Sequence, residues 1–238
     1  EALVQAQSCK NTSGQQWVMS MLGSLYKKSG DLNGALEMFQ QSIEESQSRE
    51  DDLGVLTSLS SLVDLFLYWD IPEYANLYAT EAVGIEKKTT MQNPMVSAQT
   101  YINKGRALYR LGETDSISFY TEQARALCES LPYNSGMVDI NLLNGICLTE
   151  QGGNYIESGI EELQQVIRQG TAANRAKAYH QLAQTYLKNG QTNMAEYMLD
   201  SLYLILNHND YPIHILHLDY KPILDHYLNK GNLTKVED

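Results

Sequence analysis

The segment Arg175–Leu206, RAKAYHQLAQTYLKNGQTNMAEYMLDSLYLIL, decides the fold. In its first half, four side chains repeat at the spacing of one helix face, i, i+3, i+4 and i+7: Tyr179, Leu182, Ala183 and Tyr186. After Asn189-Gly190, a second set repeats with spacings of four and three: Ala195, Leu199 and Leu202. This order predicts two amphipathic helices that pack antiparallel across a glycine turn.

The same pattern recurs along the chain. Its turns align at one residue in each unit: Gly30, Asp70, Gly112, Gly152, Gly190 and Gly231. Successive turn residues are separated by 40, 42, 40, 38 and 41 positions. The expected units cover residues 15–48, 51–88, 94–131, 138–169 and 175–206, with a partial unit at 212–238. The fourth unit fits only if two residues are added at its turn, and Asn141 and Thr121 occupy places where other units have apolar residues.

This alternation of large and small residues resembles the tetratricopeptide repeat family, although that family's period is shorter, about 34 residues. The resemblance implies an all-α fold, a right-handed superhelix (α-solenoid) of about five and a half antiparallel helix pairs. Residues 1–238 are then one repeat domain. The family also implies a protein- or peptide-binding role and a concave groove lined by the first helix of each pair.

Composition restricts the partners of this chain. The net charge is −12 and the pI is about 4.8, so a nucleic acid is not expected to bind here. The sequence contains no run of eighteen apolar residues, so no membrane span is expected in it. Only 19% of residues are charged, and Tyr, Ser, Asn and Gln are abundant, which favours an exported, extracytoplasmic protein.

The resemblance places the candidate ligand contacts on the solvent-facing side of the first helices. They are Trp17, Ser24, Asp64, Asn103, Arg106, Tyr109, Arg110, Lys177, His180 and Gln184. This mixture of aromatic, amide and basic groups suits an extended peptide with some acidic character. The alternative for any one of these residues is an ordinary solvated helix surface.

The sequence supports carboxylate binding less strongly than general peptide binding. Some members of the family hold a C-terminal carboxylate with Lys and Asn, but the corresponding first-unit residues here are Ser20 and Ser24. We therefore do not transfer that activity. Arg106 and Lys177 together could still bind a carboxylate in a different arrangement.

The sequence predicts no enzyme and no cofactor, because phosphate loops and nucleophile motifs are absent. His214 and His217, at i and i+3, could hold a metal, but an ordinary amphipathic helix explains them better and Pro222 disturbs the geometry. Cys128 and Cys147 are expected on adjacent helices. A disulfide between them is conceivable, although small buried thiols are the expectation.

Two functional hypotheses follow. The chain is similar to the extracytoplasmic tetratricopeptide regions of Bacteroidetes-type membrane-anchored regulators, in its Tyr- and Asn-rich repeats and its long period. That similarity implies a sensing module of a larger regulatory protein. The alternative is a self-contained intracellular adaptor or scaffold for protein complexes.

Overall fold

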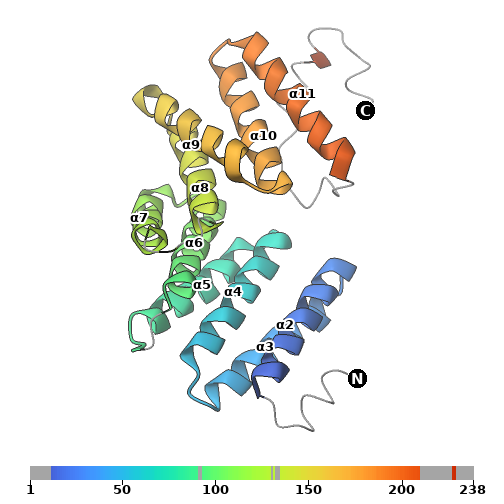
Figure 1. Ribbon diagram of the computed structural model, residues 1–238, viewed down its shortest axis with the longest axis vertical. Helices are drawn as coiled ribbons and strands as arrows, with labels where there is room; N and C mark the ends of the chain where they lie inside the picture. Colours follow the sequence, from blue (N-terminus) through green and yellow to red (C-terminus); the bar gives the residue numbers. More distant parts are fainter. Residues whose placement is uncertain (1–11, 91–92, 130, 132–134, 210–226, 229–238) are drawn as a thin grey trace. The chain divides into compact units, whose positions relative to one another are not determined.

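The computed structural model describes residues 12–90, 93–129, 131, 135–209 and 227–228 (Figure 1). Across these residues the chain forms helices and no strand. The α-helices are α2 (Thr12–Ser29), α3 (Leu32–Gln47), α4 (Asp52–Tyr68), α5 (Pro72–Glu86), α6 (Pro94–Leu111), α7 (Ile117–Cys128), α8 (Ser135–Gln151), α9 (Ile156–Gln169), α10 (Ala172–Lys188) and α11 (Thr192–Asn209). Two short 3-10 helices, η1 (Thr114–Ser116) and η2 (Gly153–Tyr155), precede α7 and α9. The all-α expectation of consecutive helix pairs is confirmed.

The chain divides into two compact units, Glu1–Gly136 and Met137–Asp238. In the first unit α2 packs on α3, α4 on α5 and α6 on α7. Each second helix also packs on the first helix that follows it, α3 on α4 and α5 on α6. In the second unit α10 packs on α11 and on α9. Apart from Tyr227 and Leu228, the expected sixth pair lies outside the described residues.

The turns between paired helices share one backbone conformation. Five aligned turn residues have positive φ: Gly30 at 84°, Asp70 at 57°, Gly112 at 76°, Gly152 at 76° and Gly190 at 71°. At four of them the next residue donates its N–H to the carbonyl five positions earlier, at 2.9–3.0 Å: Asp31 to Tyr26, Ile71 to Phe66, Glu113 to Leu108 and Gln191 to Tyr186. This hydrogen bond satisfies a carbonyl that the helix end leaves open.

The turn after α8 is different. Gly152 is followed directly by η2, whose first residue, Gly153, also has positive φ, at 57°. The 3-10 helix absorbs the extra residues that the sequence places here before α9 begins at Ile156.

Aspartates fix the start of two helices in the first unit. Asp31 accepts the N–H of Gly34 at 2.9 Å, and Asp51 accepts that of Gly54 at 3.0 Å. Each carboxylate thus satisfies one of the open N–H groups of the first helical turn.

Apolar faces of neighbouring helices form the core of the first unit. One cluster joins α3, α4 and α5 through Phe39, Leu62, Phe66 and Ala79. The close packing of α2 on α3 requires a glycine, because a Cβ added at Gly23 would lie 2.5 Å from Cε1 of Phe39.

A second core cluster joins the helices of the other unit. It includes Leu163 of α9, Leu182 and Tyr186 of α10 and Leu199 of α11, together with Tyr227. The polar residues at expected apolar places are buried and hydrogen-bonded: Thr121 donates to the Ser118 carbonyl and Asn141 to Oε1 of Gln165.

Cys128 and Cys147 are free and buried. Over the described part of the chain, no helix combines the length and the apolarity needed to cross a membrane.

The positive φ at the turns gives a direct test. At Gly112 an added Cβ meets nothing within 4 Å, so alanine there is opposed by the backbone conformation alone. We expect Gly112→Ala to lower the free energy of unfolding by about 1–2 kcal/mol. Gly84 is the matched control, because it lies inside α5 with equally open space and no positive φ. Gly84→Ala should raise stability by up to about 1 kcal/mol. Urea unfolding of both variants measures the difference, and equal effects would contradict it.

Candidate functional site

The first helices of the first unit form a continuous surface, because α4 contacts both α2 and α6. Three of the predicted site residues lie six positions before the turn residue of their pair, Ser24 in α2, Asp64 in α4 and Arg106 in α6. Ser24 is exposed, and Asp64 and Arg106 are partly exposed. We call the exposed side of α2, α4 and α6 the first-helix face.

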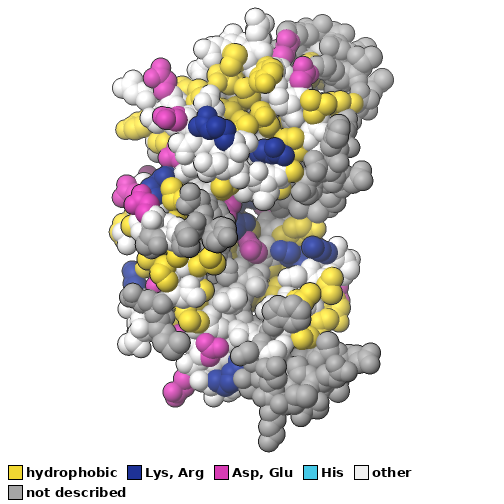
Figure 2. All heavy atoms as spheres, in the orientation of Figure 1, with side chains coloured by type: hydrophobic (Ala, Val, Ile, Leu, Met, Phe, Trp, Pro, Cys, Tyr) yellow, Lys and Arg dark blue, Asp and Glu magenta, His cyan; other side chains and the backbone are white. Residues whose placement is uncertain are grey.

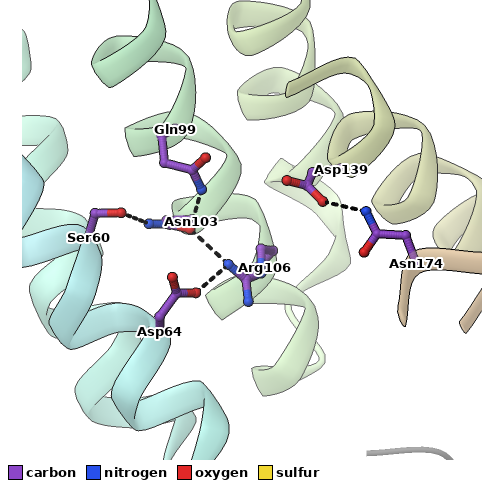
Figure 3. A network of polar contacts seen from close by, with 7 residues as sticks. All are labelled: Ser60, Asp64, Gln99, Asn103, Arg106, Asp139 and Asn174. Atoms are coloured by element: carbon purple, nitrogen blue, oxygen red, sulfur yellow. Dashed lines mark hydrogen bonds and ion pairs between the residues drawn. The ribbon is translucent and has the colours of Figure 1, made fainter. Parts of the chain in front are cut away.

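Polar contacts between α4 and α6 run along this face (Figure 3). The Asn103 amide donates to Oγ of Ser60 at 2.7 Å, and Nη1 of Arg106 lies 2.6 Å from Oδ1 of Asp64. Nearer the turns, Arg110 forms an ion pair with Asp70. Partners in these three pairs are 43, 42 and 40 residues apart, about one repeat period. The contacts therefore join each residue to a near-equivalent position of the next helix pair.

Asn103 is the centre of this network. Its Oδ1 accepts hydrogen bonds from Nε2 of Gln99 and from Nη1 of Arg106, both at 3.0 Å. With its amide nitrogen directed to Ser60, both polar groups of the side chain are engaged, and the residue is only 1% exposed. Asn103 thus holds its neighbours in position.

The basic groups of the first-helix face have partners within the face. Arg106 and Asp64 keep side-chain exposures of 36% and 39%, so their ion pair lies at the surface. The Lys27 ammonium lies 5.8 Å from the ring centroid of Tyr68 and joins α2 to α4. Solvent therefore meets a surface whose arginines and aspartates largely neutralise each other.

Polar contacts also join the first helices of the second unit. Asn174 in α10 donates to Asp139 in α8 at 3.3 Å (Figure 3). In the same pair of helices, Gln181 donates to Oγ1 of Thr149 at 2.9 Å.

The predicted residues of the second unit lie on α10. His180 and Gln184 approach each other, with Nε2 atoms 3.3 Å apart. His180 is 6% exposed, whereas Lys177 and Gln184 are partly exposed. Lys177 belongs to the second compact unit and Arg106 to the first.

Two other predicted residues complete the set. Tyr109 is partly exposed near the end of α6. Trp17 belongs to α2, but its side chain lies outside the described residues. The sequence identified most members of the α4–α6 network individually, but not which residue contacts which. No local sequence signal links Asp70 to Arg110, because Asp70 lies in the turn after α4 and Arg110 lies on α6.

The described residues offer little for catalysis. Among residues 12–90, 93–129, 131, 135–209 and 227–228, no group of three His, Cys, Asp or Glu side chains could hold a metal ion. His214 and His217 lie outside this range. Burial, with a smaller contribution from Glu150, raises the pKa of the Cys147 thiol to about 12, which opposes a role as nucleophile.

Comparison with known proteins supports a repeat architecture. Residues 18–49 and 176–204 match the sequence model of the tetratricopeptide repeat. These stretches cover most of the first helix pair and all but three residues of Arg175–Leu206. No curated protein sequence matches the chain.

Solved structures share the fold at low sequence identity. BtubC (BKLC) from P. vanneervenii is 16% identical, with a TM-score of 0.72 over 88% of this chain and 89% of that one. Nearly identical TPR-like repeats assigned to a kinesin light chain of Podosopora anserina are 19% identical, with a TM-score of 0.58 over 82% of this chain and 96% of theirs. A point variant of those repeats is 18% identical, with a TM-score of 0.59 over 88% of this chain and 98% of that one. Tetratricopeptide repeats generally mediate protein–protein interactions, and this fold is the feature shared here.

Removing Asn103 should destabilise the first unit more than removing the arginine beside it. Asn103→Ala removes a side chain that is 1% exposed together with its three hydrogen bonds, to Ser60, Gln99 and Arg106, so we expect a loss of about 1–3 kcal/mol of unfolding free energy. Arg106→Met breaks a surface ion pair and should cost less than about 1 kcal/mol. Chemical denaturation of the two variants measures both values. An Asn103→Ala protein as stable as wild type would show that the network does not hold the helices.

Cys147 should be inert in the folded protein. A pKa of about 12 leaves on the order of one thiolate in 10,000 at pH 8, and the side chain is buried. We expect iodoacetamide at pH 8 to modify Cys147 only after unfolding in guanidinium chloride. Mass spectrometry of the Cys147 peptide gives the modified fraction. Equal rates in the folded and unfolded protein would refute the expected protection.

Proposed function

We propose that this chain is a non-enzymatic protein- or peptide-binding module that uses its first helices for recognition. The observation that carries this proposal is the α4–α6 network, which fixes a row of polar side chains on the first-helix face. Fixed side chains lose little conformational freedom when a partner binds, so a preorganised surface favours affinity. The tandem helix pairs and the tetratricopeptide matches support the same role.

The charges of this face favour an extended segment that is polar and mostly neutral. Asp64 and Asp70 already hold Arg106 and Arg110, so an acidic ligand would have to compete with them. Ser24, Gln99 and Tyr109 offer hydroxyl, amide and aromatic groups beside these pairs. Such groups recognise a peptide through hydrogen bonds and ring contacts rather than through charge. Salt should therefore affect binding only weakly.

In its biological context, we assign the chain to the sensing part of a larger regulatory protein. The weakly charged surface rich in Tyr and Asn supports this assignment and resembles extracytoplasmic repeat regions. A self-contained intracellular adaptor is the alternative. A secretion signal encoded upstream of Glu1 and an apolar run of about 20 residues encoded downstream of Asp238 would support the sensor. Their absence from the full gene would support the adaptor.

Site-specific photo-cross-linking in the source organism tests the binding face. A benzophenone amino acid at Ser24 or Thr57 is placed on exposed first-helix positions, whereas Gln40 and Glu122 are exposed controls on second helices. We expect one discrete protein adduct from the first two positions and none from the controls. Asn103→Ala should weaken the adduct, because it removes the residue that orders the face.

Two results would contradict this proposal. Adducts of equal yield from all four positions would show that the first helices are not selective. A complete absence of adducts from Ser24 and Thr57 would show that this face does not bind a partner protein.

A further inference from the structure

Lys104 occupies a packing position. Counting eight residues back from each aligned turn residue gives Leu22, Leu62, Lys104, Asn144 and Leu182. Leu62 and Leu182 are fully buried in their clusters. Lys104 is also buried, at 7% exposure, although it carries an ammonium group.

The contacts of this ammonium are all to neutral oxygens. Nζ donates to Oδ1 of Asn76 at 2.5 Å and to Oγ1 of Thr80 at 2.8 Å, both on α5. Among the described residues it forms no ion pair and its third N–H has no acceptor. Burial lowers its pKa, and the charge of Glu113 opposes that shift without making a contact.

Packing alone does not explain a lysine at this position. A buried cation without an anionic partner loses its hydration, and neutral oxygens replace only part of it. A leucine at the same place would avoid this cost, as it does in two other helix pairs. A negatively charged group beside Nζ would offset this cost.

The surroundings indicate where that anion approaches. Thr80 is exposed on α5, and Leu77, three residues before it, is 59% exposed. Residues three apart on a helix are neighbours at its surface. The seam thus offers an ammonium, the amide nitrogen of Asn76 and the apolar side chain of Leu77 side by side.

We propose that the α5–α6 seam binds the carboxylate of an acidic side chain of a partner protein, held by Lys104 and Asn76. An apolar side chain next to that carboxylate covers Leu77. A charge-assisted hydrogen bond to a partly buried ammonium is stronger than one at the surface. This seam is separate from the first-helix face, and it shares with the proposed function only the premise that the chain binds proteins.

The overall charge favours a protein partner over a free anion. At a net charge of −12 the chain repels small anions in solution. A peptide that carries the carboxylate gains apolar contact with Leu77, which offsets that repulsion. Figure 2 shows apolar, basic and acidic side chains interspersed on one face of the molecule, so charge alone marks no large anion-binding patch there.

Two matched peptides test the proposal on the wild-type chain. The first is acetyl-Leu-Glu-Phe-amide and the second is its neutral counterpart, acetyl-Leu-Gln-Phe-amide. NMR of protein labelled with ¹³C-lysine follows the Cε–Hε signal of Lys104. We expect the Glu peptide to shift this signal in a saturable way, with about tenfold weaker binding for the Gln peptide.

Variants separate this seam from other surfaces. Lys104→Met should abolish saturable binding and raise the melting temperature, because it removes the buried charge. Lys87→Met changes an exposed lysine at the end of α5 and should bind as wild type. Arg106→Met should also leave the shift of the Lys104 NMR signal by the Glu peptide unchanged. Loss of that shift in Arg106→Met would place the carboxylate on the first-helix face and overturn the proposal.

The wild-type titrations remain decisive even if Lys104→Met does not fold. Equal binding of the two peptides, or no shift of the Lys104 signal with the Glu peptide, would refute the carboxylate site. Inorganic phosphate shifting that signal as strongly as the Glu peptide would show a free-anion site instead and overturn the protein partner. Loss of cross-linking at the first-helix face would leave these outcomes unaffected.

Discussion

Four of the helix pairs depend on the same backbone hydrogen bond, from the residue after the turn to the carbonyl five positions earlier. The acceptor residues are Tyr26, Phe66, Leu108 and Tyr186. Three of them, Phe66, Leu108 and Tyr186, are buried, and Phe66 and Tyr186 belong to core clusters. In these three pairs the bond couples the end of the helix to the core, because the residue that closes the turn also anchors the helix. It forms only where the intervening residue adopts positive φ.

Most of the fold could be read from the sequence because its causes are local. Glycine spacing and apolar periodicity involve residues within one helix pair, and they located the turns, including Asp70, which takes the same conformation without being glycine. The fourth turn also followed from length, since its additional residues form η2. The division into two compact units had no such signal, because it depends on contacts summed over many helices.

The candidate site was less accessible to sequence reasoning. Helical periodicity places Asp64, Asn103 and Arg106 on the first helices, but it does not show that Asn103 is buried by its partners. Those partners lie about 40 residues away, where no local pattern relates them. Lys104 illustrates the same limit. Its side chain lies in the packed seam between α5 and α6, where the ammonium donates hydrogen bonds to two neutral groups of α5. Pairing between helices is a property of register, which periodicity leaves open.

The contact between Asp64 and Arg106 bears on how such an array can change over evolution. Both residues lie six positions before the turn of their own pair, so they are equivalent places in successive repeats. A tandem duplication of the second pair would set one copy of Asp64 against another, and duplication of the third would oppose two copies of Arg106. Like charges at that distance repel. These two helix pairs are therefore not interchangeable. Their order decides whether opposite or like charges meet at this position, so recombination between them would be selected against.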